Sequence, residues 1–308
     1  MTTQPTPTTT PTAVPATALL GDAPVHRIGY GAMQLAGPGV FGPPADPGAA
    51  RAVLRRAVEL GVDHVDTAQF YGPDVVNELI REALHPYPDG LRLVTKVGAR
   101  RDGTGAWLPA AEPADLVEQV EQNLRSLNVE RLHLVNLRRF ERDDPDAAEP
   151  ALQDQLEALA GLRDAGKIAH VGVSNVTAAT VRRAHELVGI GEVQNPFSIL
   201  DRSDQPVLDA CRELGVAYVP FFPLGSAFAG GPAVLAADPH VSAVAARHGA
   251  TPSQVALAWL LAQDEQVLLI PGTGSVAHLE ENMAVLDLAL DADDLARLDQ
   301  VQERPVGH

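Results

Sequence analysis

The sequence predicts an α/β protein built as a single (β/α)8 barrel, of the kind known as a TIM barrel. Short apolar runs alternate with longer amphipathic ones from about residue 26 onward, which is the pattern of parallel strands covered by helices. Eight such apolar runs occur, and barrels of this length commonly form one domain. No G-x-G-x-x-G follows any of them, so a doubly wound dinucleotide-binding sheet is not favoured. We expect a barrel at residues 25–308, preceded by a disordered tail at residues 1–24.

The candidate strands are short and apolar, with polar or turn residues between them. They fall at residues 28–33, 62–66, 91–96, 132–137, 168–174, 193–195, 216–221 and 267–271. Amphipathic helical patterns separate them at residues 49–60, 74–84, 113–127 and 149–166. Three further helical segments, at residues 241–247, 254–262 and 293–301, exceed one helix per strand. We expect these three to be additional helices that decorate the barrel.

Composition narrows the range of functions. The chain has 23 Lys and Arg against 40 Asp and Glu, a formal net charge of -17, and phosphate recognition needs clustered cations, so nucleic acid is not an expected partner. Its single cysteine, Cys211, cannot form an internal disulfide, which indicates a reducing compartment such as the cytoplasm. The first 24 residues are rich in Thr and Pro and lack both a basic segment and a long apolar one. Neither export nor membrane insertion is therefore expected.

Polar side chains follow several of the predicted strands. Asp66 and Tyr71 follow the second strand, Lys96 ends the third, and Ser174 and Asn175 follow the fifth. In a (β/α)8 barrel the functional site lies at the carboxyl ends of the strands. We expect these side chains to meet at one mouth of the barrel.

The motifs around these residues resemble the aldo-keto reductase superfamily. They are D-T-A-x-x-Y-G at 66–72, V-T-K at 94–96, G-V-S-N at 172–175, V-Q-N at 193–195, P-L-G at 223–225, and I-P-G-T followed by E-N within 270–282. The resemblance covers roughly residues 26–302. Within the superfamily, the sequence is similar to a bacterial subgroup that includes pyridoxal reductases. It implies reduction of an aldehyde or ketone to an alcohol, with pyridoxal as the expected substrate. The alternatives are a secondary-metabolite or sugar carbonyl, or a cofactor-binding regulatory protein with little turnover.

The resemblance implies four catalytic residues. Tyr71 is the implied general acid, since a phenol with an ordinary pKa of about 10 keeps its proton at neutral pH. Lys96 is the implied cation beside it, and Asp66 the carboxylate that pairs with the lysine. Most members end the fourth strand in His, whereas this sequence has Arg138. We expect its permanent charge to lower the Tyr71 pKa and to engage an anionic oxygen of the substrate, with a structural salt bridge as the alternative.

The resemblance also implies a nicotinamide cofactor site. Ser174, Asn175 and Gln194 correspond to the residues that orient the nicotinamide carboxamide. The loop at 271–282 corresponds to the adenosine-phosphate loop, although Gly272 stands at the usual lysine position and His278 at the usual arginine. We favour NADP(H), with NAD(H) as the alternative. The other expected cofactor contacts are Gly31, Met33, Gln34, Asp66, Phe221, Phe222, Pro223, Leu224, Gly225, Thr273, Ser275, Glu281 and Asn282.

The substrate pocket is the part of the site that the sequence defines least, because loops over the mouth of the barrel form it. Phe41 and Trp107 are expected to line it together with Gln34, although Trp107 as a hydrophobic lid is an equal alternative. His133 and His170 lie on strand patterns and are interpreted as scaffold residues, so no metal site is expected. The oligomeric state stays open.

Overall fold

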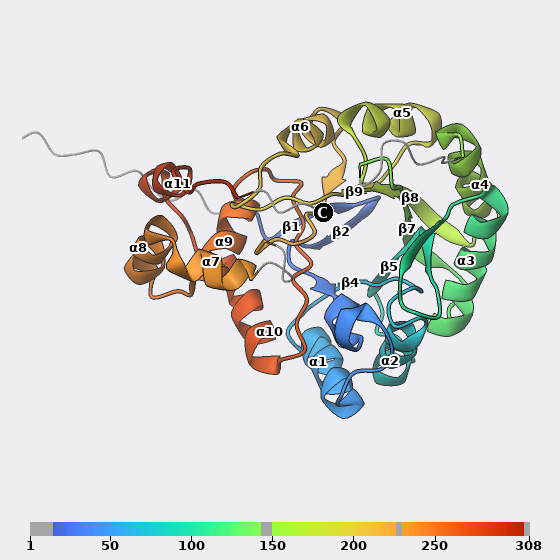
Figure 1. The fold of residues 1–308 in the computed structure, drawn as a ribbon, viewed down its shortest axis with the longest axis horizontal. Coiled ribbons are helices and arrows are strands. Elements are labelled where there is room, and N and C mark those ends of the chain that lie inside the picture. Colours follow the sequence, from blue (N-terminus) through green and yellow to red (C-terminus); the bar gives the residue numbers. More distant parts are fainter. Residues whose placement is uncertain (1–14, 143–149, 226–229, 305–308) are drawn as a thin grey trace, which may run out of the picture.

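A computed structural model describes residues 15–142, 150–225 and 230–304. Its centre is a curved sheet of parallel strands with helices outside it (Figure 1). In spatial order the strands are β3 (Tyr30–Gly31), β4 (His64–Asp66), β5 (Arg92–Arg101), β7 (Leu132–Arg138), β8 (Ile168–Ser174), β9 (Glu192–Gln194) and β10 (Ala217–Tyr218). The expected barrel is confirmed, and each of these strands overlaps one of the predicted runs.

The eighth predicted strand closes the barrel through isolated bridges. Leu269 pairs with Ile28 on one side, and Val267 pairs with Tyr218 on the other, both in parallel. The buried side chain of Arg27 reinforces this closure, because its guanidinium group donates to the carbonyl oxygens of Val267 at 3.0 Å and Leu261 at 2.8 Å. We call the junction between residues 27–31 and 267–272 the seam.

Six helices alternate with the strands around the outside of the barrel (Figure 1). They are α1 (Pro47–Glu59), α2 (Val75–Leu84), α3 (Pro113–Leu127), α4 (Leu152–Asp164), α5 (Ala178–Val188) and α6 (Gln205–Leu214). In α1, the Asp46 side chain accepts from the Ala49 backbone N–H at 2.9 Å and caps the helix, while Val53, Leu54 and Ala57 form its buried stripe. The apolar periodicity of the sequence thus corresponds to the helix–sheet interface.

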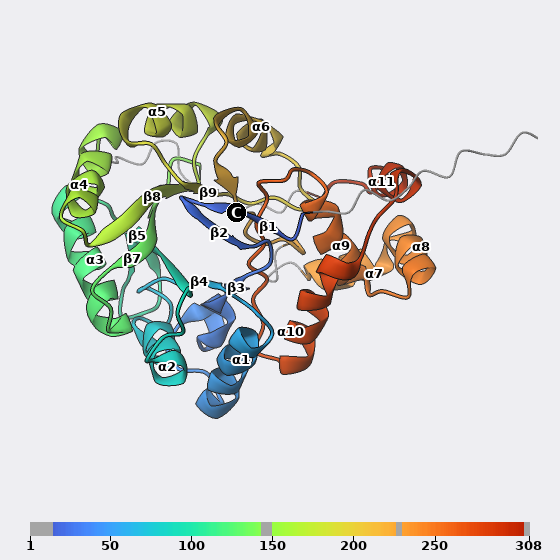
Figure 2. The ribbon, with the colours of Figure 1, turned by 180° about the vertical axis from the view of Figure 1, so that it is seen from behind.

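The remaining helices gather on one side of the barrel (Figures 1 and 2). They are α7 (Gly231–Ala237), α8 (Pro239–His248), α9 (Pro252–Leu261), α10 (Val276–Met283) and α11 (Ala292–Leu298). The three predicted extra segments correspond to α8, α9 and α11. Helix α9 carries a capping box of Thr251 and Gln254 and is apolar on all sides, because other elements surround it.

A β-hairpin crosses one end of the barrel (Figure 2), and it corrects the predicted tail. Strands β1 (Thr17–Leu20) and β2 (Ala23–His26) pair antiparallel. Leu20 and Val25 pack with Val94, Leu134 and Leu268 in the barrel interior. The hairpin lies where the strands begin, since the Leu20 carbonyl oxygen is 2.8 Å from Nε2 of His133, near the start of β7. The tail prediction is wrong for residues 15–24, and residues 1–14 lie outside the described residues.

Two further elements differ from the prediction. Strand β3 ends at Gly31, and a 3-10 helix at Ala32–Leu35 follows, so Met33 is not in a strand. Strand β5 runs past Lys96 to Arg101 and pairs antiparallel with β6 (Trp107–Ala110), which the sequence analysis missed. This second hairpin rises from the carboxyl end of β5, so it stands at the mouth of the barrel.

Candidate active site

Three of the predicted catalytic side chains meet at the carboxyl ends of β4 and β5. Asp66 is the last residue of β4, and Lys96 lies on the neighbouring strand with its Nζ in contact with Asp66 Oδ1 and 3.3 Å from the Thr67 carbonyl oxygen. The Lys96 ammonium also lies 5.3 Å from the centre of the Tyr71 ring. All three side chains are buried. The sequence therefore predicted this group correctly as a spatial cluster.

The electrostatics of the group favour a phenol that keeps its proton. Burial raises the pKa of Tyr71 above its ordinary value, and the charges of Lys96 and Arg138 oppose that rise without cancelling it. Burial also disfavours the charge of Lys96, but Asp66 overcomes this and raises the Lys96 pKa above its ordinary range. The charge of Arg138 thus lowers the Tyr71 pKa, as expected, but desolvation outweighs both cations and the net shift is upward.

Arg138 ends β7 at the same mouth. It pairs in register with Ser174, is half-buried, and holds its guanidinium group 5.1 Å from the centre of the Phe140 ring. Its charge acts on Tyr71. Gly98 lies against the Arg138 backbone with φ at +104°, so β5 can pass this close only without a side chain.

The three residues expected to hold a carboxamide are also brought together. Ser174 pairs in register with Gln194, and the Asn175 backbone N–H donates to the Gln194 carbonyl oxygen at 2.9 Å. Gln194 Nε2 donates to Asp66 Oδ2 at 2.7 Å, which joins this group to the catalytic cluster. The side-chain oxygen Oε1 of Gln194 is buried and has no hydrogen-bond partner among the described residues. Such an acceptor fits the amide N–H of a nicotinamide ring.

The expected phosphate loop lies across the seam. Tyr30 Oη donates to the Thr273 carbonyl oxygen at 2.6 Å, and the Ser275 backbone N–H donates to Thr273 Oγ1 at 3.0 Å. Ser275 caps α10, whose free N–H groups suit an anion. A Cβ at Gly272 would lie 2.5 Å from the Gly31 carbonyl oxygen. A side chain at this position, which the resemblance aligns with the usual lysine, would therefore clash with the backbone of Gly31.

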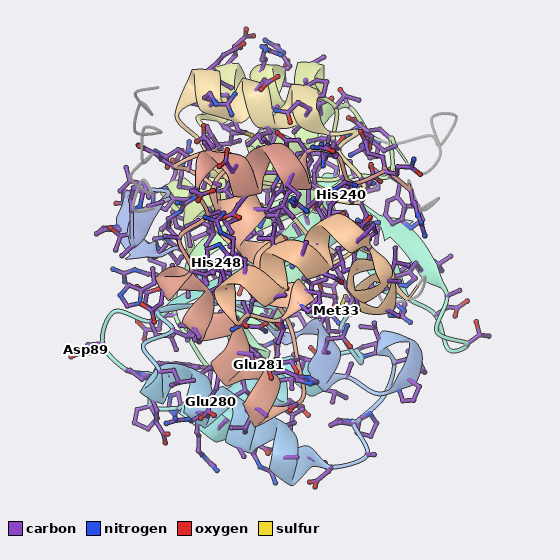
Figure 3. All side chains as sticks on the ribbon, turned by 90° about the vertical axis from the view of Figure 1, so that its left-hand side faces the viewer. Met33, Asp89, His240, His248, Glu280 and Glu281 are labelled. Carbon is purple, nitrogen blue, oxygen red and sulfur yellow. The ribbon has the colours of Figure 1, made fainter. Side chains whose placement is uncertain are left out.

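The other predicted residues of this loop are placed more loosely. His278 is exposed on the first turn of α10, while Asn282 is buried near its end. Glu281 accepts from Gln254 Nε2 at 2.9 Å through its backbone oxygen. Figure 3 labels Glu280 and Glu281 on this side of the molecule, where Glu280 pairs with Arg56 of α1 at 2.7 Å.

Phe221 and Phe222 form a turn beside β9. Their rings meet edge to face at 5.2 Å, and Phe222 has a φ of +55°. The Gly225 backbone N–H donates to the Phe222 carbonyl oxygen at 2.9 Å, which closes the turn that includes Pro223 and Leu224. All five residues are half-buried and available to a ligand at the mouth.

Phe41 and Trp107 come together through Arg101, which the sequence analysis missed. The Arg101 guanidinium lies 4.1 Å from the Trp107 ring centre and 5.4 Å from that of Phe41, and it donates to the Val40 carbonyl oxygen at 2.9 Å. Phe70 then packs edge to face on both Trp107 and Tyr71. Trp107 is therefore connected to Tyr71 through Phe70, and Phe41 is connected to Trp107 through Arg101.

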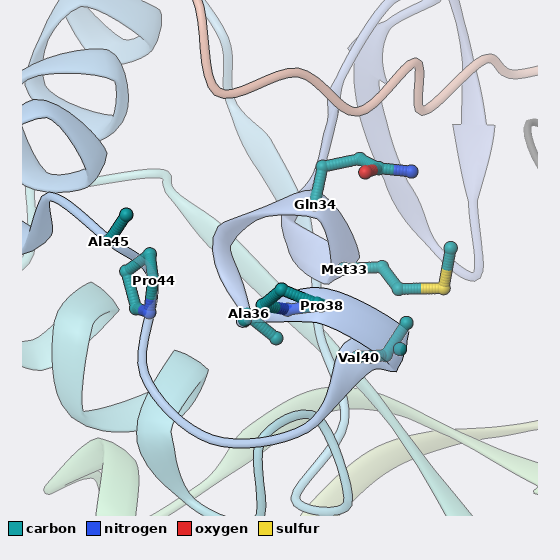
Figure 4. Close-up of a pocket in the computed structure, with 9 residues that line it drawn as sticks. Met33, Gln34, Ala36, Pro38, Val40, Pro44 and Ala45 are labelled. Carbon is teal, nitrogen blue, oxygen red and sulfur yellow. The ribbon is translucent and has the colours of Figure 1, made fainter.

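A pocket adjoins this region in the segment after β3 (Figure 4). Met33 and Gln34 contribute to it, and a Cβ at Gly272 would lie 3.3 Å from Gln34 Cγ, which places Gln34 against the phosphate loop. The pocket is lined by Met33, Gln34, Ala36, Gly37, Pro38, Gly39, Val40, Pro44 and Ala45. Asp66, Tyr71 and Lys96 do not line it.

A buried polar network supports β4 and β5 from outside the barrel, and the sequence analysis did not find it. Thr67 Oγ1 donates to Asn77 Oδ1 at 2.8 Å, and Thr95 Oγ1 donates to Asn123 Oδ1 at 2.7 Å. Asn77 Nδ2 joins the two pairs by donating to Asn123 Oδ1 at 2.9 Å. Because Thr67 and Thr95 adjoin Asp66 and Lys96, the network fixes the strand ends that carry the ion pair.

The described residues contain one group of side chains that could hold a metal ion, at the opposite end of the barrel. It consists of Asp22, His133 and His170. His170 Nε2 hydrogen-bonds Asp22 Oδ1 at 2.7 Å, and His133 Nε2 hydrogen-bonds the Leu20 carbonyl oxygen. Burial lowers the pKa of His133 to about 4, so this ring is neutral at pH 7. These contacts tie the β1–β2 hairpin to β7 and β8, in agreement with the predicted scaffold role.

A parallel barrel with a buried acid, lysine and tyrosine at its mouth agrees with the carbonyl-reducing enzymes that the sequence motifs resemble. A sequence profile of the Aldo/keto reductase family matches residues 27–303, and the chain belongs to this family. It is therefore an oxidoreductase of the kind that reduces a carbonyl group. In the described part of the chain, no helix combines the length and apolar character that a membrane crossing requires.

Individual relatives narrow the comparison. The chain is 50% identical over 285 residues, 92% of its length and 98% of the relative's, to pyridoxine 4-dehydrogenase of Escherichia coli (strain K12). It is 36% identical to an uncharacterized oxidoreductase of Schizosaccharomyces pombe, which spans 92% of this chain and 89% of the relative. Among solved structures, an aldo-keto reductase from Klebsiella pneumoniae in complex with NADPH superposes with a TM-score of 0.78 at 25% identity, covering 94% of this chain and 95% of the other.

Proposed function

We propose that the protein reduces pyridoxal to pyridoxine with NADPH. The observation that carries this proposal is the buried Tyr71, which keeps its proton beside the Lys96–Asp66 pair at the mouth of the barrel. The identity of 50% to a pyridoxine 4-dehydrogenase supports the substrate. Phe41 and Trp107, joined by Arg101, supply aromatic surface for a flat ring.

A bound nicotinamide cofactor would supply the hydride that reduces the carbonyl carbon. In our proposal Tyr71 donates its phenolic proton to the carbonyl oxygen as negative charge develops there. The Lys96 ammonium stabilises the resulting phenolate, and Asp66 holds the ammonium in place. Gln194, Ser174 and Asn175 orient the nicotinamide so that one face meets the substrate.

Arg138 has a separate role in this proposal. Its guanidinium stands at the mouth and acts on Tyr71, so it can also donate hydrogen bonds to a second oxygen of the substrate. The phenolic 3-oxygen of pyridoxal, beside the aldehyde, is such a group. A fixed cation at this position would favour pyridoxal over an aromatic aldehyde that lacks this oxygen.

We propose NADPH as the preferred cofactor, although the 271–282 segment has no Lys or Arg. Thr273, Ser275 and His278 supply hydroxyl and ring N–H donors, and the amino end of α10 adds its backbone N–H groups. Neutral donors of this kind bind a 2′-phosphate less strongly than a cation does. We further propose that the protein acts in the cytoplasm and, given its net charge of -17, without a nucleic-acid partner.

The test is to mix the purified protein with NADPH and pyridoxal and to follow the nicotinamide absorbance, with Tyr71→Phe in parallel. Rapid oxidation of NADPH that is lost in Tyr71→Phe would support both the reaction and the proton donor. NADPH binding without oxidation would overturn pyridoxal as the substrate and direct the search to other carbonyls. Oxidation that persists in Tyr71→Phe would overturn the role of Tyr71.

A further inference from the structure

A second carboxylate lies inside the barrel next to the catalytic cluster. Glu192 is buried at the first position of β9, two residues before Gln194, so both side chains point to the same face of the strand. Glu192 Oε1 accepts from Gln194 Nε2, and Glu192 Oε2 accepts from Asn136 Nδ2 at 3.3 Å. Its register partners on β8 and β10 are Gly172 and Ala217, which leave room for the carboxylate.

Burying this carboxylate is unfavourable by itself. Burial and the nearby charge of Asp66 raise the pKa of Glu192 to about 7, while Lys96 opposes the rise. An apolar side chain at this position would avoid that penalty. Glu192 therefore does not serve to stabilise the fold, and its presence must be explained by the contacts that its carboxylate makes.

The contact that matters is the one with Gln194. The amide nitrogen of Gln194 donates to Asp66 Oδ2 and to Glu192 Oε1, one carboxylate from β4 and one from its own strand. Ionised carboxylate oxygens only accept, so the NH2 edge of the amide must face both of them. The amide oxygen is then turned the other way, and it is this oxygen that lacks a partner among the described residues.

Protonation of Glu192 does not disturb this arrangement. A protonated Glu192 still offers one acceptor oxygen to Gln194, and its O–H needs an acceptor of its own. Asn136 Oδ1 is buried without a partner in the described part of the chain, and turning the Asn136 amide would present it. Turning Gln194 instead would break its bond to Asp66. Asn136 can thus absorb the change while Gln194 stays fixed.

We propose that Glu192 is a positioning residue that holds the Gln194 amide with its oxygen presented to the nicotinamide carboxamide. This inference rests on the proposed role of Gln194 in cofactor binding. Two acceptors, Glu192 and Asp66, then restrict Gln194 to one of its two amide orientations. Without Glu192, Asp66 alone restricts the orientation of the Gln194 amide, and the nicotinamide half of the cofactor binds more weakly.

The experiment compares two ligands by fluorescence titration and displacement: NADPH, and adenosine 2′,5′-bisphosphate, which lacks the nicotinamide. For Glu192→Met we expect the Kd for NADPH to rise about tenfold, the effect of one buried hydrogen bond, while the Kd for the bisphosphate stays unchanged. Glu192→Gln keeps an acceptor oxygen for Gln194 and should restore NADPH binding to within about threefold. In a Gln194→Leu background, Glu192→Met should add no further loss for NADPH.

The outcomes separate this inference from the proposed function. Equal weakening of both ligands in Glu192→Met, or no weakening of either, would overturn the role of Glu192. Failure of the unsubstituted protein to bind NADPH would instead overturn the proposed cofactor. If Glu192→Met does not fold, Glu192→Ala gives the same comparison, since it also removes both acceptor oxygens and must show the same selective loss.

Discussion

Substitution of Gly272 tests the close approach of the two segments of the chain that meet at the seam. A Cβ at this position would lie 2.5 Å from the Gly31 carbonyl oxygen, whereas ordinary van der Waals contact begins at 3.4 Å. This nearest neighbour is a backbone atom, so the two segments must separate by about 0.9 Å. Overpacking of this kind costs roughly 1–3 kcal/mol. For a protein of this size, Gly272→Ala should lower the unfolding temperature by roughly 2–6 °C.

The matched control is Gly274→Ala in the same loop. No heavy atom lies within 4 Å of a Cβ at Gly274, and its φ is not in the left-handed region. This change should be neutral or stabilise by at most about 1 kcal/mol, since it restricts the unfolded chain. Thermal unfolding followed by circular dichroism compares the two variants. Equal unfolding temperatures would refute the steric explanation for the missing lysine.

Four further predictions address the site. Gly274→Lys adds a cation to the phosphate loop without steric cost, so the Kd for NADPH should fall about twofold to fivefold while the Kd for NADH is unchanged. An unchanged Kd for NADPH would mean that the 2′-phosphate binds elsewhere. Lys96→Met should reduce kcat/KM by about a hundredfold or more, because the phenolate loses its cation. Steady-state kinetics across pH would measure this reduction. Arg138→His should reduce kcat/KM for pyridoxal more than for a plain aromatic aldehyde, and an equal reduction for both would contradict contact with the 3-oxygen. The pKa of Glu192 is higher in the folded protein than in the unfolded chain, so its contribution to stability is complete below about pH 4.5 and is lost as the pH rises through about 7. Urea unfolding between pH 4.5 and 8 should therefore show that the free energy of unfolding falls by about 3 kcal/mol less in Glu192→Gln than in the parent protein.

The sequence predicts most of the barrel because strands and helices bury regular stripes of apolar side chains. It failed at β1, where a segment rich in Thr and Pro concealed two short strands that bury little more than Leu20 and Val25. Gly21 and Asp22 between them are a typical two-residue hairpin turn, and this signal was present in the sequence. A short hairpin contributes too few positions for periodicity to be visible.

Some residues of the site could likewise be predicted from the sequence, and others could not. Asp66, Tyr71 and Lys96 belong to local motifs, so resemblance to a family was enough to single them out. Arg101 and Glu192 act through partners that are distant in sequence, such as Val40 and Asn136, and no local pattern announces such contacts. A charged residue directly before the predicted strand at 193–195, in G-E-V-Q-N, was the one available signal for Glu192.

The chain has two tryptophans, and the fold places them in contrasting surroundings. Trp107 is 40% exposed at the mouth, beside Phe70 and the Arg101 guanidinium, whereas Trp259 is 1% exposed in α9 and stacks on Phe197. Their emission spectra should therefore be separable, with Trp107 emitting at longer wavelength and open to soluble quenchers. Trp107 can report ligand arrival and energy transfer to a bound reduced nicotinamide, while Trp259 reports loss of the native fold. The protein thus carries its own pair of optical probes, and Trp107→Phe would isolate the second.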